Sequence, residues 1–259
     1  MTRALSRNSY RTAQGLSLRF LLFSLLLLPG AAAAQDQEGF KNLQVLSEDI
    51  SRERLMSVMR GFSRSTGMRC ATCHVGEEGS PLSTYDFAAD DKSAKLKARE
   101  MMRMVQAING TYLADLPGRR EPNVGVTCAT CHRGISRPEA IESLIGRLAT
   151  EEDVDFAVER YRTLRERYHG SAAYDFSERP LLSVSDALAG SDDVGAALQI
   201  LALNLEFHPE SAQTMFAMAR LHEEAGDVQE AVDLYRRGLE IMPDNRQARE
   251  RLSALTGGA

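Results

Sequence analysis

The chain has few of the features that would place it in a membrane or on nucleic acid. Its apolar run from Phe20 to Leu28 is too short to span a bilayer comfortably. Positive charge is in deficit, with a formal net charge of −5 at pH 7, so nucleic acid is excluded as the expected partner. Aromatic residues are scarce, at 6% without Trp, yet a hydrophobic content of 43% suffices for one or two compact domains and argues against wholesale disorder.

The first 34 residues have the composition of a secretory leader. Their only charged residues are four Arg, the run Phe20 to Leu28 follows, and the small residues Ala31 to Ala34 end the segment. This order predicts a signal peptide over residues 1–34 that is cleaved after Ala34, and hence a periplasmic protein. An uncleaved leader that serves as a membrane anchor is the alternative. No Cys lies near the cleavage point, so a lipoprotein anchor is not indicated.

Charge divides the remaining chain into two parts. Residues 35–140 carry 15 Lys and Arg against 14 Asp and Glu, whereas residues 141–259 carry 12 against 22. The balance therefore changes from +1 to −10. We expect two domains with a boundary near residue 140.

All four Cys belong to two copies of one pattern. The copies are Cys70-Ala71-Thr72-Cys73-His74 and Cys128-Ala129-Thr130-Cys131-His132. Cys-x-x-Cys-His is the attachment pattern of c-type haem, because thiols at this spacing can each bond one of the two porphyrin vinyl groups. The adjacent imidazole, of His74 or His132, can then bind the iron from one face. The sequence thus predicts two covalently bound haems c.

Three other readings of the Cys pairs explain less. A four-Cys zinc site normally separates its knuckles by about 15–20 residues, but 54 residues lie between Cys73 and Cys128. A thioredoxin-like pair would need a βαβ context, and no strand pattern appears nearby. Disulfides are compatible with export. However, none of these readings accounts for a His after both pairs.

Methionine pairs precede each motif on segments that are helical by composition. They are Met56 with Met59, and Met101 with Met104. Residues three apart share a helix face, so a haem plane laid on that face would meet them. Met commonly closes the second axial position in electron carriers, because a thioether favours Fe(II) and raises the reduction potential. Met at helical spacing also fills cores, so spacing alone leaves the ligand open.

Together these stretches resemble the cytochrome c subunit of photosynthetic reaction centres. The resemblance covers about residues 40–138 and is carried by Met59 to Phe62, Gly67 to His74, Ala98 to Asn109 and Gly125 to Gly134. It implies axial pairs of His74 with Met59 and of His132 with Met101, with Met104 as a packing residue. It also implies redox partner proteins, such as a membrane-bound photosynthetic reaction centre or a respiratory complex.

The chain departs from that family in three respects. It has two haem motifs where the full-length family member has four, and the family's lipid-anchoring Cys is missing. Some family haems use a distal His from the loop before the second motif, but Gly110 to Thr127 contains no His. Both irons are therefore expected to have His/Met ligation.

The acidic half contains a 34-residue repeat. Residues 193–209 align with residues 227–243, so that Ala197 matches Ala231 and Pro209 matches Pro243. This period is the tetratricopeptide signature. A fainter copy begins at Asp153 with a spacing of 40, and a closing helix is expected after Asp244. Such a stack either binds a protein partner, here a basic one, or forms a solvated acidic surface.

These predictions combine into an all-α protein, with a dihaem domain of Met-bearing helices and loops followed by tetratricopeptide-like repeats. The leading function is outer-sphere electron transfer by an exported dihaem cytochrome rather than enzymatic catalysis, with the repeats docking its partner. One alternative is a dihaem peroxidase-like enzyme with one open haem. The other is a scaffold or assembly protein in which the haems are structural.

Overall fold

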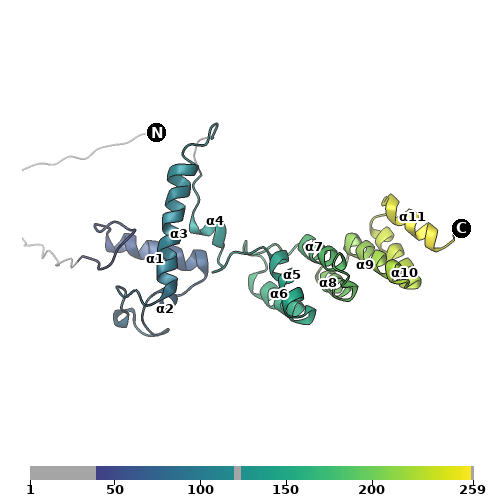
Figure 1. The fold of residues 1–259 in the computed structure, drawn as a ribbon, viewed down its shortest axis with the longest axis horizontal. Helices are drawn as coiled ribbons and strands as arrows, with labels where there is room; N and C mark the ends of the chain where they lie inside the picture. Colours follow the sequence, from purple (N-terminus) through teal and green to yellow (C-terminus); the bar gives the residue numbers. More distant parts are fainter. Residues whose placement is uncertain (1–38, 120–123, 258–259) are drawn as a thin grey trace, which may run out of the picture. The chain divides into compact units, whose positions relative to one another are not determined.

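The structure is a computed structural model that describes residues 39–119 and 124–257. Within these ranges it consists of helices and loops, and the one β-type pairing is an isolated antiparallel bridge between Val75 and Asp86 (Figure 1). The all-α prediction is confirmed. In the same ranges no helix is long and apolar enough to cross a membrane. The predicted leader lies outside the described residues.

Two long helices and two short ones form the first part of the chain. The long helices are α1 (Arg52–Thr66) and α3 (Ser93–Ala107), and the short ones are α2 (Cys70–Cys73) and α4 (Cys128–His132). A 3-10 turn, η1 (Leu82–Thr84), lies between α2 and α3, and a π-helical turn, η2 (Ile108–Tyr112), extends α3. Helix α1 packs on α4 and α2 packs on α3. Each Cys-bearing helix therefore contacts the long helix that precedes the other Cys-bearing helix.

A close backbone contact joins the ends of α1 and α4. The N–H of Gly134 donates to the carbonyl of Ser65 at 2.8 Å. Gly67 ends α1 in the left-handed conformation with φ of +69°, and a Cβ there would lie 2.4 Å from the Gly134 carbonyl oxygen. Glycine at position 67 thus satisfies both the turn and the close approach.

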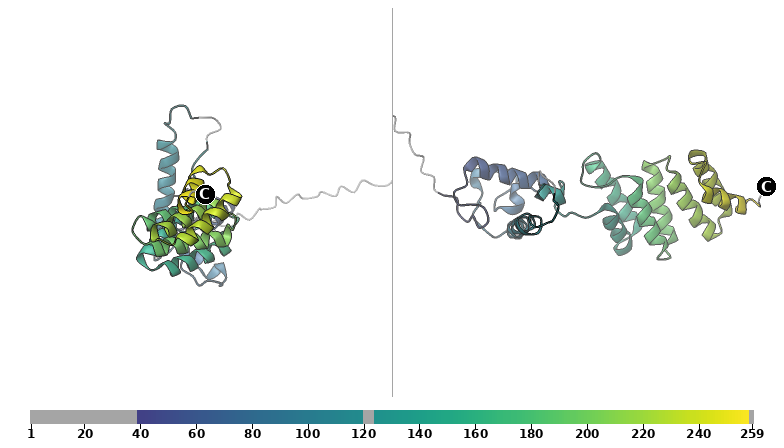
Figure 2. Two further views of the ribbon diagram at one scale, coloured as in Figure 1. Left: turned by 90° about the vertical axis from the view of Figure 1, so that its right-hand side faces the viewer. Right: turned by 90° about the horizontal axis from the view of Figure 1, so that it is seen from above.

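Seven helices form the repeat part, and their caps are readable in the sequence. In chain order they are α5 (Ile141–Glu151), α6 (Val154–Tyr168), α7 (Glu178–Ala189), α8 (Val194–Phe207), α9 (Ala212–Ala225), α10 (Val228–Ile241) and α11 (Arg246–Leu255). Asp153, Asp193, Ser211 and Asn245 each accept a backbone N–H from the first turn of the following helix. The helices pack as the hairpins α5–α6, α7–α8 and α9–α10, and α11 packs on α10 (Figure 2).

The repeat register agrees with the predicted period. Helices α8 and α10 begin 34 residues apart, and their matched residues Ala197 and Ala231 are both 0% exposed. Small side chains at these positions let neighbouring helices approach closely. The fainter copy is helix α6, where Ala157 is likewise 0% exposed. Its spacing of 40 arises mainly because the loop 169–177 is longer than the loop 208–211. The predicted closing helix is α11.

Candidate haem sites

The two Cys pairs lie on the short helices α2 and α4, and none of the four Cys forms a disulfide. Cys70 and Cys131 are exposed, and Cys73 and Cys128 are partly buried. One helical turn separates the members of each pair, so their sulfur atoms share a helix face. Among the described residues no three His, Cys, Asp or Glu side chains gather as a metal-binding group. The two Cys pairs lie on different helices, α2 and α4.

The second motif holds its imidazole in one tautomer. The Nδ1 atom of His132 lies 2.9 Å from the backbone carbonyl of Ile135. A carbonyl can only accept, so Nδ1 carries the proton and Nε2 keeps its lone pair. Histidine ligands of metals typically have their other ring nitrogen held in this way. This contact leaves Nε2 of His132 as the nitrogen that can act as a ligand.

The first motif differs at the same atom. The Nδ1 atom of His74 is buried and has no hydrogen-bond partner, and the ring meets Phe87 edge-on, with centroids 4.9 Å apart and planes at 69°. Burial lowers the pKa of the His74 imidazole, helped by the positive charges of Lys95 and Arg99 and opposed by the Phe87 backbone carbonyl. The sequence-identical motifs therefore place their imidazoles in unlike surroundings.

The predicted methionine ligands occupy the two long helices. Met59 is partly buried on α1, and Met101 is 43% exposed on α3. Met104, one turn further along α3, is 45% exposed, whereas Met102 is partly buried. Both members of the α3 pair therefore present apolar surface outward, and the assignment of Met59 and Met101 as axial ligands remains a prediction.

The distribution of buried residues fits a domain completed by two porphyrins. In the described residues from 39 to 134, Arg99 is the only buried residue, while every buried apolar residue of the described chain lies at Ile135 or beyond. The same stretch exposes large apolar side chains, namely Phe40, Leu82, Phe87, Leu96, Met101, Met104, Tyr112, Leu116 and Val124. A porphyrin on each Cys pair would cover apolar surface that the short chain cannot bury itself.

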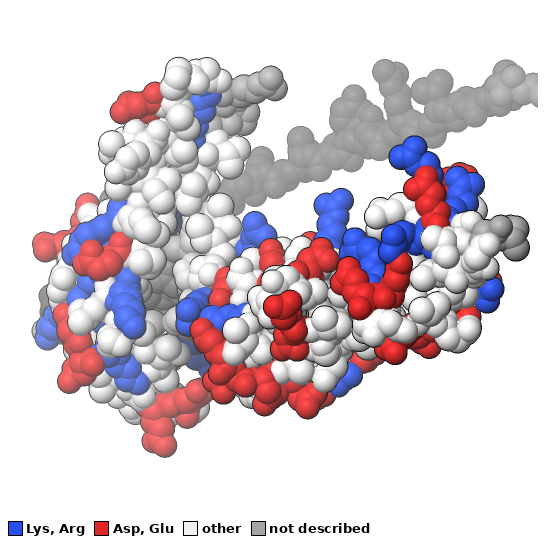
Figure 3. All heavy atoms as spheres, turned by 45° about the vertical axis from the view of Figure 1, so that its right-hand side comes forward, with Lys and Arg blue, Asp and Glu red and all other residues white. Residues whose placement is uncertain are grey.

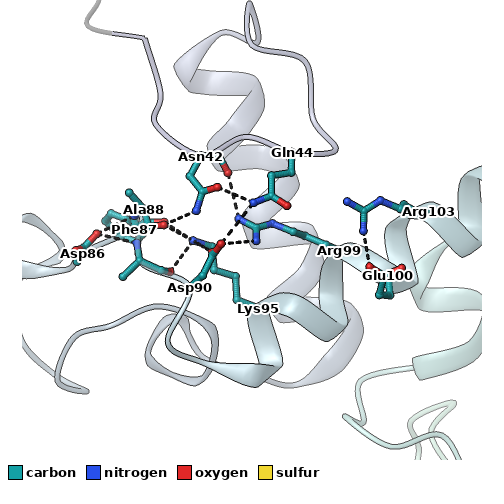
Figure 4. Close-up of polar contacts among 11 residues, drawn as sticks. Asn42, Gln44, Asp86, Phe87, Ala88, Asp90, Lys95, Arg99, Glu100 and Arg103 are labelled. Atoms are coloured by element: carbon teal, nitrogen blue, oxygen red, sulfur yellow. Dashed lines mark hydrogen bonds and ion pairs between the residues drawn. The ribbon is translucent and has the colours of Figure 1, made fainter.

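Two groups of polar residues at the site are not among the predicted site residues. Asn109 bonds both backbone groups of Val126, two residues before Cys128. Lys95 and Arg99 on α3 both bond Asp90, and Lys95 also bonds the backbone carbonyl of Ala89 after the first motif (Figure 4). Both stretches are part of the resemblance, but no spacing rule shows that these particular side chains turn inward.

Ion pairs link side chains on and beside the repeat helices. Arg162 pairs with Glu206 at 2.6 Å, and Arg147 pairs with Glu139 at 3.3 Å. Acidic side chains still cover much of the visible face of the repeat helices (Figure 3). Residues 141–259 as a whole have a charge balance of −10.

Comparisons with known proteins agree with both parts of the chain. Residues 28–165 match the family described as photosynthetic reaction centre cytochrome C subunit, and residues 192–244 match the tetratricopeptide repeat. The tetratricopeptide prediction is therefore confirmed. The first match extends beyond residue 140, and the predicted domain boundary stays a prediction.

Two curated relatives match the haem-motif part. Cytochrome c-554 of Chloroflexus aurantiacus is 30% identical over 103 residues, which cover 40% of this chain and 22% of that protein. The photosynthetic reaction center cytochrome c subunit of Roseobacter denitrificans is 36% identical over 105 residues, which cover 39% and 26%. The chain thus spans about a quarter of the length of these relatives.

Solved structures show only a distant likeness. The crystal structure of MamA is 15% identical, with a TM-score of 0.33, and the match covers 46% of this chain and 66% of that one. A likeness at this level carries no argument about function.

Proposed function

Because the chain belongs to the photosynthetic reaction centre cytochrome c subunit family, we propose that it carries two covalent haems c and transfers electrons between protein partners. The Cys70 and Cys73 thiols would form the thioether links of one haem, and those of Cys128 and Cys131 the links of the other. His74 and His132 would each bind an iron through Nε2, with Met59 and Met101 as the opposite ligands. When bound, haem supplies one-electron Fe(III)/Fe(II) chemistry.

The observation that carries this proposal is the missing apolar core of the first part. Two thiol pairs, each with its own imidazole, lie in the one stretch of the described chain that buries no apolar residue. Haem attachment accounts for the thiols, the imidazoles and the exposed apolar surface together. A zinc or disulfide site would leave that surface uncovered.

The first experiment counts haems in the full chain after expression with c-type haem maturation enzymes. We expect two covalent haems per chain from the pyridine haemochrome spectrum and the intact mass. The double variant Cys70→Ala/Cys73→Ala should carry one covalent haem. The double variant Cys128→Ala/Cys131→Ala should also carry one. A chain that matures without covalent haem would contradict the proposal.

The axial methionines can be tested against neighbours on their own helices. Met59→Leu should give one haem a high-spin spectrum, whereas Met56→Leu should leave both haems low-spin. Met101→Leu and Met104→Leu form the equivalent pair on α3. Loss of the Met ligand should also lower the potential of that haem, because a thioether favours Fe(II). A high-spin haem in the unmodified protein would instead favour the peroxidase-like alternative.

The repeat part would dock a basic protein that exchanges electrons with the haems. Support comes from its charge balance of −10 and from its tetratricopeptide match, because such stacks usually bind proteins. A basic soluble electron carrier should reduce the full chain at a rate that falls steeply as salt rises. An acidic carrier of similar potential should show the opposite trend. If the reduction rates by the basic and the acidic carrier depend on salt in the same way, the repeat part has no docking role.

Export is the remaining part of the proposal. It rests on the basic and then apolar leader that ends at Ala34, and it would place haem attachment in the periplasm. Cell fractionation with mass spectrometry of the mature N-terminus tests it. A mature chain that begins after Ala34 supports the periplasmic location, whereas retention of the leader in the membrane fraction indicates an anchor.

A further inference from the structure

A nearly buried lysine lies against the backbone that follows the first haem motif. The Nζ atom of Lys95 contacts the carbonyls of Phe87, Ala88 and Ala89 at 3.0, 3.0 and 2.7 Å, and Oδ1 of Asp90 at 3.0 Å (Figure 4). Its side chain is only 11% exposed. A lysine is seldom buried unless paired, and here one carboxylate and three carbonyls solvate its charge.

A second cation holds the same segment from the other side. Arg99, one turn along α3, bonds Asp90 at 2.9 Å and the backbone carbonyl of Asn42 at 3.1 Å. The side chain of Asn42 in turn donates to the Ala88 carbonyl at 2.6 Å. We call Asn42, Asp90, Lys95 and Arg99 the α3 clasp. It fixes residues 87–90 through Lys95 and Arg99 on α3 and through Asn42, which is remote in sequence.

The clasp acts next to His74. The Phe87 ring packs on the His74 imidazole, and the Nδ1 atom of His74 is buried without a hydrogen-bond partner. The carbonyl of Phe87 accepts a hydrogen bond from Lys95 at 3.0 Å. In the second motif the corresponding interaction is made, because Nδ1 of His132 contacts the Ile135 carbonyl at 2.9 Å.

We propose that Lys95 is a positioning residue for the first haem ligand, holding Phe87 against His74 and competing with Nδ1 for the Phe87 carbonyl. This inference rests on the haem attachment proposed above. A hydrogen bond from Nδ1 to a carbonyl makes an imidazole a more basic ligand and so stabilises Fe(III). By engaging that carbonyl, and through its own positive charge, Lys95 raises the reduction potential of the first haem.

The test is a redox titration of the full two-haem chain with Lys95→Met and a matched control. Lys97→Met removes the same charge from an exposed position two residues along α3. We expect Lys95→Met to lower the potential of the first haem by about a tenfold change in equilibrium constant, or ~59 mV for one electron. The second haem should not move, and Lys97→Met should shift neither. The variant that lacks Cys128 and Cys131 assigns the waves.

Two further variants separate positioning from a general effect on folding. Lys95→Arg keeps the charge and the donors and should restore the potential together with the low-spin magnetic resonance signals of the first haem. Asp90→Asn neutralises the carboxylate beside Lys95 and should shift the same potential upward. This opposite sign keeps the idea testable even if Lys95→Met fails to fold.

Two kinds of failure are distinguishable. A chain without covalent haem refutes the proposed function itself. A loaded chain refutes only the role of Lys95 if Lys95→Met and Lys97→Met move the first potential equally, or if Lys95→Arg behaves as Lys95→Met does.

Discussion

The side-chain amide of Asn109 makes two hydrogen bonds to the backbone of Val126, like those between paired strand residues. Its Nδ2 donates to the Val126 carbonyl at 2.8 Å, and its Oδ1 accepts the Val126 N–H at 2.7 Å. Asn109 lies in the π-helical turn η2, which departs from regular helix at this point. The pair therefore joins the end of α3 to the segment that enters the second haem motif.

Replacing this amide should weaken the second haem site selectively. Asn109→Ala leaves a partly buried N–H and carbonyl without partners, at a cost of about 1–3 kcal/mol. We expect a lower free energy of unfolding and a less complete low-spin spectrum for the second haem, measured by denaturant titration and optical spectroscopy. Gln106→Ala, at an exposed position one turn earlier, is the control. Equal effects of the two substitutions would show that the Asn109 bonds are not important.

A side chain at Gly67 should lower the stability of the protein more than one at another left-handed glycine. Gly67→Ala adds a Cβ that would lie 2.4 Å from the Gly134 carbonyl oxygen, at a residue with φ of +69°. Gly79→Ala has a φ of +88° but nothing within 4 Å of the added carbon. We expect Gly79→Ala to destabilise by about 1 kcal/mol and Gly67→Ala by ~1–3 kcal/mol more. Equal losses in denaturant titrations would contradict the close approach of α1 and α4.

Asp90 should contribute to acid sensitivity. Hydrogen bonds from Arg99, Asn42 and Lys95 hold the pKa of its carboxyl well below the usual range. Because the folded-state pKa is lowered, the stabilisation is present above the unfolded pKa of about 3.9 and is lost as the pH falls below it. Asp90→Asn should therefore flatten the stability curve between about pH 5 and pH 2.

The neighbouring residue provides the control for this pH effect. Asp91 is exposed, so Asp91→Asn should leave the acid limb of the stability curve close to that of the unmodified chain. Chemical denaturation at a series of pH values measures both variants. An Asp90→Asn curve as steep as that of the unmodified chain would show that the α3 clasp does not depend on the carboxylate charge.

Much of the repeat part was predictable because its signals are local. Asp153 and Asp193 each cap the helix that follows them, and Ala157 and Ala197 mark where neighbouring helices touch. These signals do not depend on a constant repeat length, so they predict α6 even though its spacing is 40 residues. The haem motifs were equally readable, because the attachment chemistry itself requires two thiols and an imidazole close together in sequence.

The surroundings of the two imidazoles were not predictable. The motifs at His74 and His132 are identical in sequence, but Nδ1 of His132 contacts the Ile135 carbonyl, whereas Nδ1 of His74 is buried without a partner. A lysine on a helix is normally solvated, and its inward turn depends on the path of the loop 86–90. The packing of α2 on α3 is likewise tertiary, since each short helix contacts a partner outside its own motif.

The last prediction concerns Gly238, which lets α10 approach α9. A Cβ at this position would lie 2.4 Å from Cε1 of Phe216, a residue that is 7% exposed and stacked on Tyr235. Because the ring is enclosed in the core, it cannot move away without loss of packing. Gly238→Ala should therefore lower the free energy of unfolding by about 1–3 kcal/mol.

A second glycine and a compensating change make this test specific to the contact. Gly195→Ala, in the first turn of α8, meets nothing closer than Asp193 Oδ1 at 3.9 Å and should stabilise by about 0.5–1 kcal/mol, as Ala for Gly in a helix does. Phe216→Leu should cost less in the Gly238→Ala background than alone, because the smaller side chain relieves the overlap. Strict additivity of the two substitutions would show that Gly238 and Phe216 do not limit the approach of the helices.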